Sequence, residues 1–204
     1  MNRGASQSRI DRLNERIDGL GETIGNLNDL ESSAVTYKLN QLDPNTNSEG
    51  SLTYDTSDNT VSINYIRGST SNFVHESTHA HQFDTGDLAF PAGGGDPVGV
   101  DLFDEVSAYK AQYAYDPSSV SRLPSSSQIN SIGDINATWV RNIQNPVTGT
   151  FPYQAQHVGI RPVNVNSTVR FMRTAYPTVN FGSMNNALTL RQLYPGIITN
   201  RWEK

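Results

Sequence analysis

The chain has 204 residues, enough for one sizeable domain with a core of its own. It contains no cysteine, which excludes disulfides and thiolate metal sites and leaves histidines and carboxylates as metal ligands. A formal net charge of −5 gives no sign of the basic surface that a nucleic-acid partner requires. No apolar run approaches the roughly 20 residues of a membrane span, and residues 1–9 lack the apolar core of a secretory signal.

The first predicted element is a helix over residues 7–31. Glycines inside it weaken any isolated coiled coil. We therefore expect residues 1–32 to form an amphipathic helix packed on the domain, or a stem joining it to a carrier or partner subunit, and residues 33–204 to form a single domain. Its apolar residues alternate spacings of three and four, a heptad pattern: Ile10, Leu13, Ile17, Leu20, Ile24 and Leu27.

Strands are predicted over residues 34–39, 51–55 and 60–66, the last two forming a hairpin. A helix over residues 71–83 follows, with Ser71 as a candidate N-cap. The sheet is therefore small and antiparallel or mixed. In the hairpin, apolar residues alternate with polar ones, which predicts one buried face: Leu52, Tyr54, Val61, Ile63 and Tyr65.

Residues 75–79 read His-Glu-Ser-Thr-His and match the H-E-x-x-H pattern. Positions four apart share one face of a helix, so His75 and His79 can present two imidazoles to one metal ion. Glu76 lies about 100° round the helix, where it can act as a general base. The sequence therefore predicts a metal site on this helix.

A second helix, predicted over residues 101–113, supplies a third ligand. Glu105 follows His79 after a glycine-rich loop that is long enough to reverse the chain direction. Two histidines and a glutamate leave a fourth position open, which is the arrangement of a catalytic zinc rather than a structural one. Zn²⁺ is therefore the expected cofactor, bound by His75, His79 and Glu105.

Other third ligands are weighed against this one. The metzincin pattern fails, because Gln82 and Thr85 occupy its glycine and last histidine positions. Asp101 and Asp104 remain competitors, either as ligands or as groups that orient a ligating histidine. His81 points elsewhere on the helix and is interpreted as non-ligating.

Beyond residue 117 the chain is serine-rich, and helical segments are predicted over 128–144, 167–176 and 183–194. No internal repeat or strong linker is apparent. We therefore expect an α+β fold, with the small sheet followed by the active-site helix and a mainly helical C-terminal part.

The H-E-x-x-H motif followed by a helical glutamate resembles the gluzincin branch of zinc metallopeptidases. More narrowly, residues 72–86 and 104–109 resemble metallopeptidase toxin domains at the C-termini of Rhs-type and other polymorphic toxins, including type VI effectors. The resemblance covers residues 60–117 and implies a zincin-like fold, a protein or peptide substrate, and a cognate immunity protein. Several gluzincins carry an aspartate four residues after the ligand glutamate, where this chain has Tyr109.

The expected reaction is peptide-bond hydrolysis with Glu76 as the general base. A further donor should stabilise the oxyanion, and the candidates are Tyr109, Tyr153 and His157. Tyr109 lies one turn beyond Glu105 on the same helix face. His157 lies in a stretch without clear periodicity.

Two rival functions use the same ligands. One is a zinc amidase that acts on cell-wall or other non-protein amides. The other is a non-catalytic binding module that the metal stabilises. A third possibility is that the fold arrests in an inhibited state, with a segment such as residues 145–165 covering the cleft. A toxin domain secreted or delivered into a target cell without a classical signal peptide would have such a sequence, and so would an ordinary cytoplasmic protein.

Overall fold

The computed structural model describes residues 6–45, 49–125, 127–145 and 148–200. The ends of the predicted extension and domain, residues 1–5 and 201–204, lie outside this range. In chain order the elements are α1 (Gln7–Glu31), β1 (Thr36–Leu42), β2 (Ser51–Asp55), β3 (Thr60–Ile66), α2 (Thr70–Thr85), β4 (Phe90–Pro91), α3 (Leu102–Tyr115), α4 (Pro117–Ser121), the 3₁₀ turn η1 (Ile132–Asp134), α5 (Ala137–Arg141), α6 (Val169–Ala175), α7 (Leu190–Leu193) and β5 (Ile197–Ile198).

The first three strands form a mixed sheet in the order β1–β3–β2. β1 runs parallel to β3, while β2 and β3 form the predicted antiparallel hairpin. The two hairpin strands have the predicted bounds, whereas β1 begins two residues later and ends three residues later than predicted. The α+β class and the small mixed sheet are thereby confirmed.

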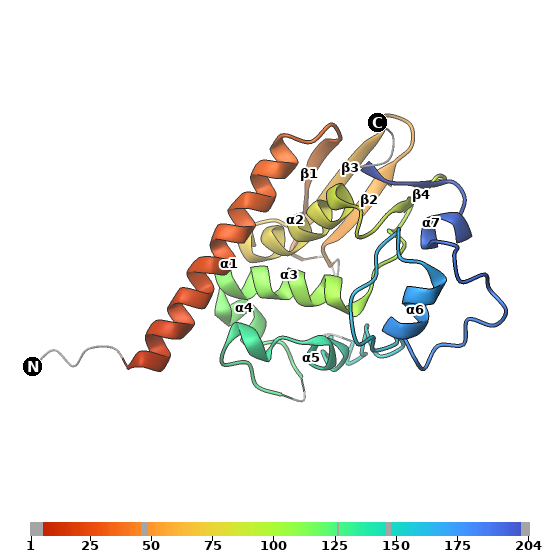
Figure 1. Ribbon diagram of the computed structural model, residues 1–204. Coiled ribbons are helices and arrows are strands. Elements are labelled where there is room, and N and C mark those ends of the chain that lie inside the picture. The colour runs from red at the N-terminus through yellow and green to blue at the C-terminus, as the bar shows by residue number, and fades with distance from the viewer. Residues whose placement is uncertain (1–5, 46–48, 126, 146–147, 201–204) are drawn as a thin grey trace, which may run out of the picture.

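One face of the hairpin is buried, as its alternating pattern predicts. Leu52 lies opposite Ile63 in the strand register, and both are buried together with Val61. These side chains share a core cluster with Ala80 and Phe83 of α2. The sheet therefore supports α2, the helix that carries the histidine motif (Figure 1).

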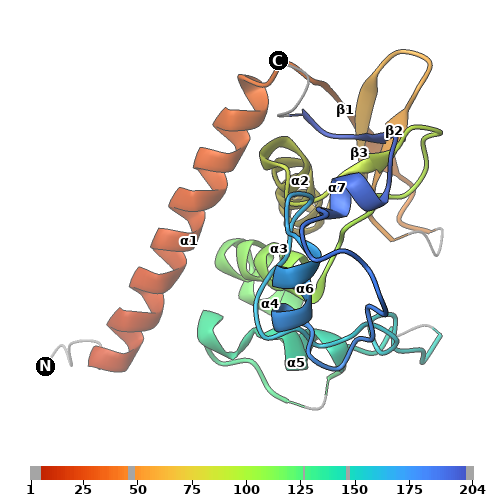
Figure 2. The same ribbon diagram turned by 45° about the vertical axis from the view of Figure 1, so that its right-hand side comes forward.

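Helix α3 lies beside α2 and packs on its other side against α4 and α5 (Figures 1 and 2). Leu102 and Val106 of α3 are buried in a second core cluster with Val120, Trp139 and Val140. The boundary between the two clusters is thus the contact between α2 and α3. This contact positions the candidate site.

Helix α1 runs along one side of the molecule and contacts α2, α3 and η1 (Figure 1). Thr23 and Leu30 are its buried residues. Helix α1 thus packs along one side against α2 and α3. Among the described helices, none has the length and apolar character needed to cross a membrane.

The C-terminal part is less helical than predicted. The helix expected over residues 128–144 is replaced by η1 and the short α5. Two polar side chains bind nearby backbone and compete with a continuous helix: Asp134 accepts the amides of residues 130 and 131, and Asn136 caps α5. The helices predicted over residues 167–176 and 183–194 are shorter in the structure, where they correspond to α6 and the four-residue α7. Loops connect these short helices.

Candidate metal centre

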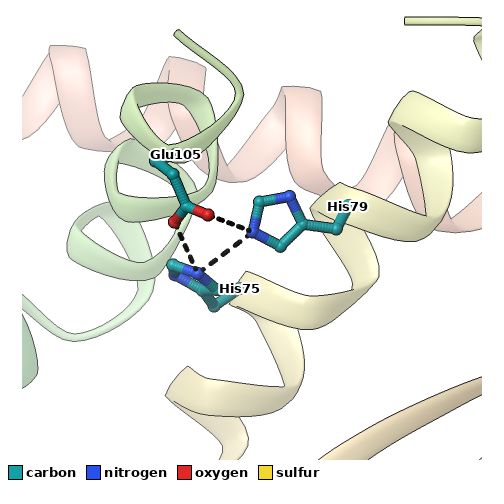
Figure 3. Close-up of side chains that lie close together, drawn as sticks. All are labelled: His75, His79 and Glu105. Carbon is teal, nitrogen blue, oxygen red and sulfur yellow. Dashed lines mark hydrogen bonds and ion pairs between the residues drawn. The ribbon is translucent and has the colours of Figure 1, made fainter. Parts of the chain in front are cut away.

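Helix α2 presents His75 and His79 on one face, as the spacing predicts (Figure 3). Their Nε2 atoms lie 3.2 Å apart. Glu105 approaches from α3, with Oε2 3.5 Å from His75 Nε2 and Oε1 3.6 Å from His79 Nε2. All three residues are buried, and together they form a group that can hold a metal ion.

The two helices begin in ways that fix these side chains. Ser69, rather than the predicted Ser71, caps α2 by accepting the amide of Asn72, so the helix starts one residue earlier. Asp101 caps α3 in a capping box with Asp104, whose carboxylate accepts the Asp101 amide at 2.7 Å. The two aspartates that compete with Glu105 as ligands are thus used to start α3, and Glu105 is the carboxylate that faces the histidines.

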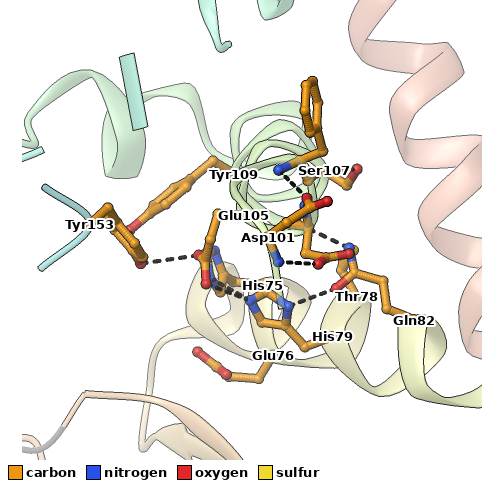
Figure 4. A network of polar contacts seen from close by, with 12 residues as sticks. His75, Glu76, Thr78, His79, Gln82, Asp101, Glu105, Ser107, Tyr109 and Tyr153 are labelled. Carbon is orange, nitrogen blue, oxygen red and sulfur yellow. Dashed lines mark hydrogen bonds and ion pairs between the residues drawn. The ribbon is translucent and has the colours of Figure 1, made fainter. Parts of the chain in front are cut away.

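Each histidine is oriented by a glutamine that the sequence pattern did not predict, and Figure 4 shows one of the two, Gln82 beside His79. His79 Nδ1 lies 2.7 Å from Gln82 Oε1, and His75 Nδ1 lies 3.0 Å from Gln112 Oε1. The amide nitrogen of Gln82 donates to the Asp104 carbonyl, so its oxygen must face His79. Each Nδ1–H therefore donates to a glutamine, and each Nε2 lone pair faces the other ligands.

Gln112 is held in the same manner. Its amide nitrogen donates to Ser119 Oγ at 3.2 Å, and that hydroxyl donates to the Asp116 carbonyl at 2.7 Å. The Gln112 oxygen is therefore turned towards His75. The position of Gln112, seven residues after Glu105 on the same helix, is the sequence signal that would have found it.

The electrostatics of the group favour a bound cation. Burial lowers the pKa of His79, but the neighbouring Glu105 carboxylate outweighs burial and raises this pKa to about 9. Burial raises the pKa of Glu105, but His79 and His75 outweigh that effect and hold it well below its usual value. Two imidazole lone pairs and a carboxylate so close together require a positive charge between them, supplied by a proton or a metal ion.

The donor distances fit a tetrahedral metal. With metal–ligand bonds of about 2.0–2.1 Å, a tetrahedral zinc site has donor–donor separations of roughly 3.3–3.4 Å. Here the two imidazole nitrogens lie 3.2 Å apart, and each lies 3.5 or 3.6 Å from a different oxygen of Glu105. With one Glu105 oxygen as the third donor, the three donor atoms lie within 4.8 Å of one another, so side-chain shifts can bring them to a tetrahedral ion.

Glu76 lies in the same cavity, which has a volume of about 670 Å³ and is also lined by His75, His79 and Glu105. Burial raises the pKa of Glu76, and Asn72 Nδ2 donates to its Oε1 at 3.3 Å. Gly50 passes directly over this carboxylate, since a Cβ at residue 50 would lie 2.2 Å from Glu76 Oε1. The backbone before β2 thus confines the predicted general base.

The predicted tyrosines meet at the other side of the ligands. Tyr153 donates from its hydroxyl to Glu105 Oε2 at 3.0 Å (Figure 4). Tyr109 packs its ring edge-on against His75, with centroids 4.5 Å apart, and its hydroxyl lies 3.3 Å from that of Tyr153. Burial and the Glu105 charge raise the pKa of both tyrosines, so both hydroxyls keep their protons.

His157 is not brought to this group. It is exposed and lines a different cavity of about 460 Å³, with Asp101 and Tyr176. His81, interpreted as non-ligating, places Nε2 3.1 Å from Asp29 Oδ2 on α1. Of the segment predicted to cover the cleft, residues 145, 148, 152 and 153 line the cavity wall, while residues 146 and 147 lie outside the described range.

Comparison with known proteins adds no relative: no family model matches the chain, and neither a curated protein nor a solved structure matches it.

Proposed function

We propose that this chain is a zinc-dependent hydrolase that cleaves peptide bonds, with zinc held by His75, His79 and Glu105. The observation that carries the proposal is the convergence of these three ligands in a cavity that also contains the Glu76 carboxylate. A purely structural site would need no buried acid beside it. The donor set supports zinc, because two imidazoles and one carboxylate are the ligands of catalytic zinc sites.

Bound zinc would supply Lewis acidity, which lowers the pKa of a coordinated water and polarises a carbonyl. Glu76 would take a proton from the attacking water and return it to the leaving amine. Its raised pKa brings the acid closer to neutrality, where proton exchange in both directions is efficient. Tyr153, whose hydroxyl already reaches Glu105, is better placed than His157 to donate to an oxyanion.

A peptide substrate is favoured by the strand beside the cavity. β2 lies at an edge of the sheet order β1–β3–β2. Gly50, Ser51 and Leu52, at its start, line the same cavity as the metal ligands. An extended peptide can pair with such an edge through its backbone, which would carry its amide bonds past Glu76.

The biological setting that we propose is a toxin or effector protease domain, with a cognate immunity protein as partner. This part rests on the resemblance of residues 72–86 and 104–109 to the toxin metallopeptidases. It is a proposal about context and is independent of the chemistry of the site.

The test is a matched set of three variants assayed for zinc content and for cleavage of a random peptide library, read by mass spectrometry. Glu76→Gln should keep about one zinc per chain and lose turnover, whereas His79→Ala should lose the metal. His81→Ala, on the same helix outside the site, should keep both. Undiminished turnover in Glu76→Gln would refute the mechanism.

The same protein separates the rival functions. Zinc binding without peptide cleavage, but with release of fragments from cell-wall peptidoglycan, would favour the amidase. Zinc binding with neither activity, together with a loss of thermal stability on zinc removal, would favour the binding module.

A further inference from the structure

Helix α1 is fixed to the domain through one face only. Arg16 Nε donates to the Ala114 carbonyl at 3.2 Å. Gly19 allows a close approach to α3, since a Cβ there would lie 3.0 Å from Ala114 Cβ. Thr23 and Leu30 are buried on the same face. These contacts leave the neighbouring face of the helix only partly covered by the domain.

That neighbouring face carries a stripe of apolar side chains. Leu20 and Leu27 are half-buried. Single exposed apolar residues are ordinary, but a stripe that repeats every 3.5 residues along one helix is the pattern that packs against a second helix. The other four members of the stripe are exposed: Ile10 by 39%, Leu13 by 44%, Ile17 by 63% and Ile24 by 59%. We call these six residues the apolar seam.

The residue types in the apolar seam indicate which kind of partner it binds. In heptad terms the isoleucines occupy position a and the leucines occupy position d. β-Branched residues at a with leucine at d favour a parallel, two-stranded coiled coil, in which each layer meets the same layer of the other helix. We propose that two copies of this chain pair in parallel through the apolar seam of α1.

The domain leaves room for this pairing. Arg16 and Thr23, which face the domain, directly precede the seam residues Ile17 and Ile24, so the domain lies about 100° round the helix from them. A two-fold axis along the seam then puts the second domain on the opposite side.

The N-terminal part of α1 also lacks support from its own domain. Residues 7–15 are all exposed, and this part of the helix extends past α3 in both views (Figures 1 and 2). A helical segment without packing is marginal in water, and Gly21 and Gly25 weaken this helix further. Pairing would bury the seam and supply the missing stabilisation.

The test is sedimentation equilibrium of the full chain at concentrations up to about 1 mM. The unaltered protein should pass from the 22.4 kDa monomer to twice that mass as concentration rises. Ile17→Glu places a charge in the seam and should raise the dissociation constant by at least about tenfold. Ser8→Glu adds the same charge on the opposite side of α1 and should leave the dimer unchanged. Because Ile17 and Ser8 are exposed, circular dichroism should show both variants folded.

A single cysteine tests the orientation, since the chain has none of its own. In the parallel pair, Ile10→Cys faces its counterpart and should form a covalent dimer on mild oxidation. In an antiparallel pair residue 10 would lie opposite residue 27, and the two introduced thiols would be about 25 Å apart. A protein that stays monomeric, a dimer that tolerates Ile17→Glu, or a dimer that Ile10→Cys does not cross-link would overturn the proposal.

Discussion

Replacing Gln82 with leucine is expected to weaken metal binding while leaving the fold in place. The change removes the acceptor 2.7 Å from His79 Nδ1 and the donor 3.0 Å from the Asp104 carbonyl. Gln82 and His79 are both buried, so water cannot replace these bonds easily. An unpaired buried donor costs about 1–3 kcal/mol, and loss of a group that orients a metal-ligating histidine typically costs 10–100-fold in affinity. We therefore expect the zinc dissociation constant to rise by about 10–100-fold, which corresponds to about 1.4–2.8 kcal/mol.

The assay is a zinc competition titration against a chromophoric chelator, with circular dichroism to confirm folding. Gln112→Leu should give a similar loss, because Gln112 has the same relation to His75. Gln82→Glu keeps an acceptor for His79 and should retain most of the affinity. If Gln82→Leu is folded and binds zinc within about twofold of the unaltered protein, the reasoning that Gln82 orients His79 is refuted.

Three further predictions concern the site and α1. Burial lowers the pKa of His79 and Glu105 raises it to about 9 overall, so zinc binding at about pH 7.5 should release roughly one proton, measured by calorimetry in buffers of different ionisation enthalpy. Gly50→Ala would place a Cβ 2.2 Å from Glu76 Oε1, so it should displace that carboxylate and reduce turnover while zinc content is unchanged. Gly25→Ala, at a site with no neighbour within 4 Å, should stabilise the fold by about 1 kcal/mol in urea unfolding, whereas Gly19→Ala, 3.0 Å from Ala114 Cβ, should not.

The candidate metal-binding group could be predicted because the positions of its residues depend on local geometry. His75 and His79 share a face on any α-helix, and Glu105 follows from the chemistry that two histidines require and from a well-marked helix start at Asp101. The hairpin could be predicted for the same reason, since alternation and a short connection are local signals. The parallel pairing of β3 with β1 could not be predicted. Parallel strands are joined by a long connection, and their pairing leaves no local pattern in either strand.

Other features of the site depend on contacts between distant segments. Tyr153 reaches Glu105 across 48 positions of sequence, from a stretch without helical or strand periodicity. His157, four residues further on, has the same sequence character and lines a different cavity. Both residues were candidates only because their side chains can donate a hydrogen bond. The three-dimensional path of the chain brings Tyr153 to Glu105 and takes His157 to the other cavity.

The two glutamines connect the ligand-bearing helices in opposite directions. Gln112 of α3 accepts from His75 of α2, while Gln82 of α2 donates to the backbone of α3 at Asp104, next to Glu105. The glutamine side chains that orient the two histidines therefore also join α2 to α3. Both helices also belong to buried clusters, so the packing of α2 and α3 helps to position His75, His79 and Glu105. Helix packing and these hydrogen bonds would therefore pre-organise the group for a metal ion, as the proposed catalytic role requires.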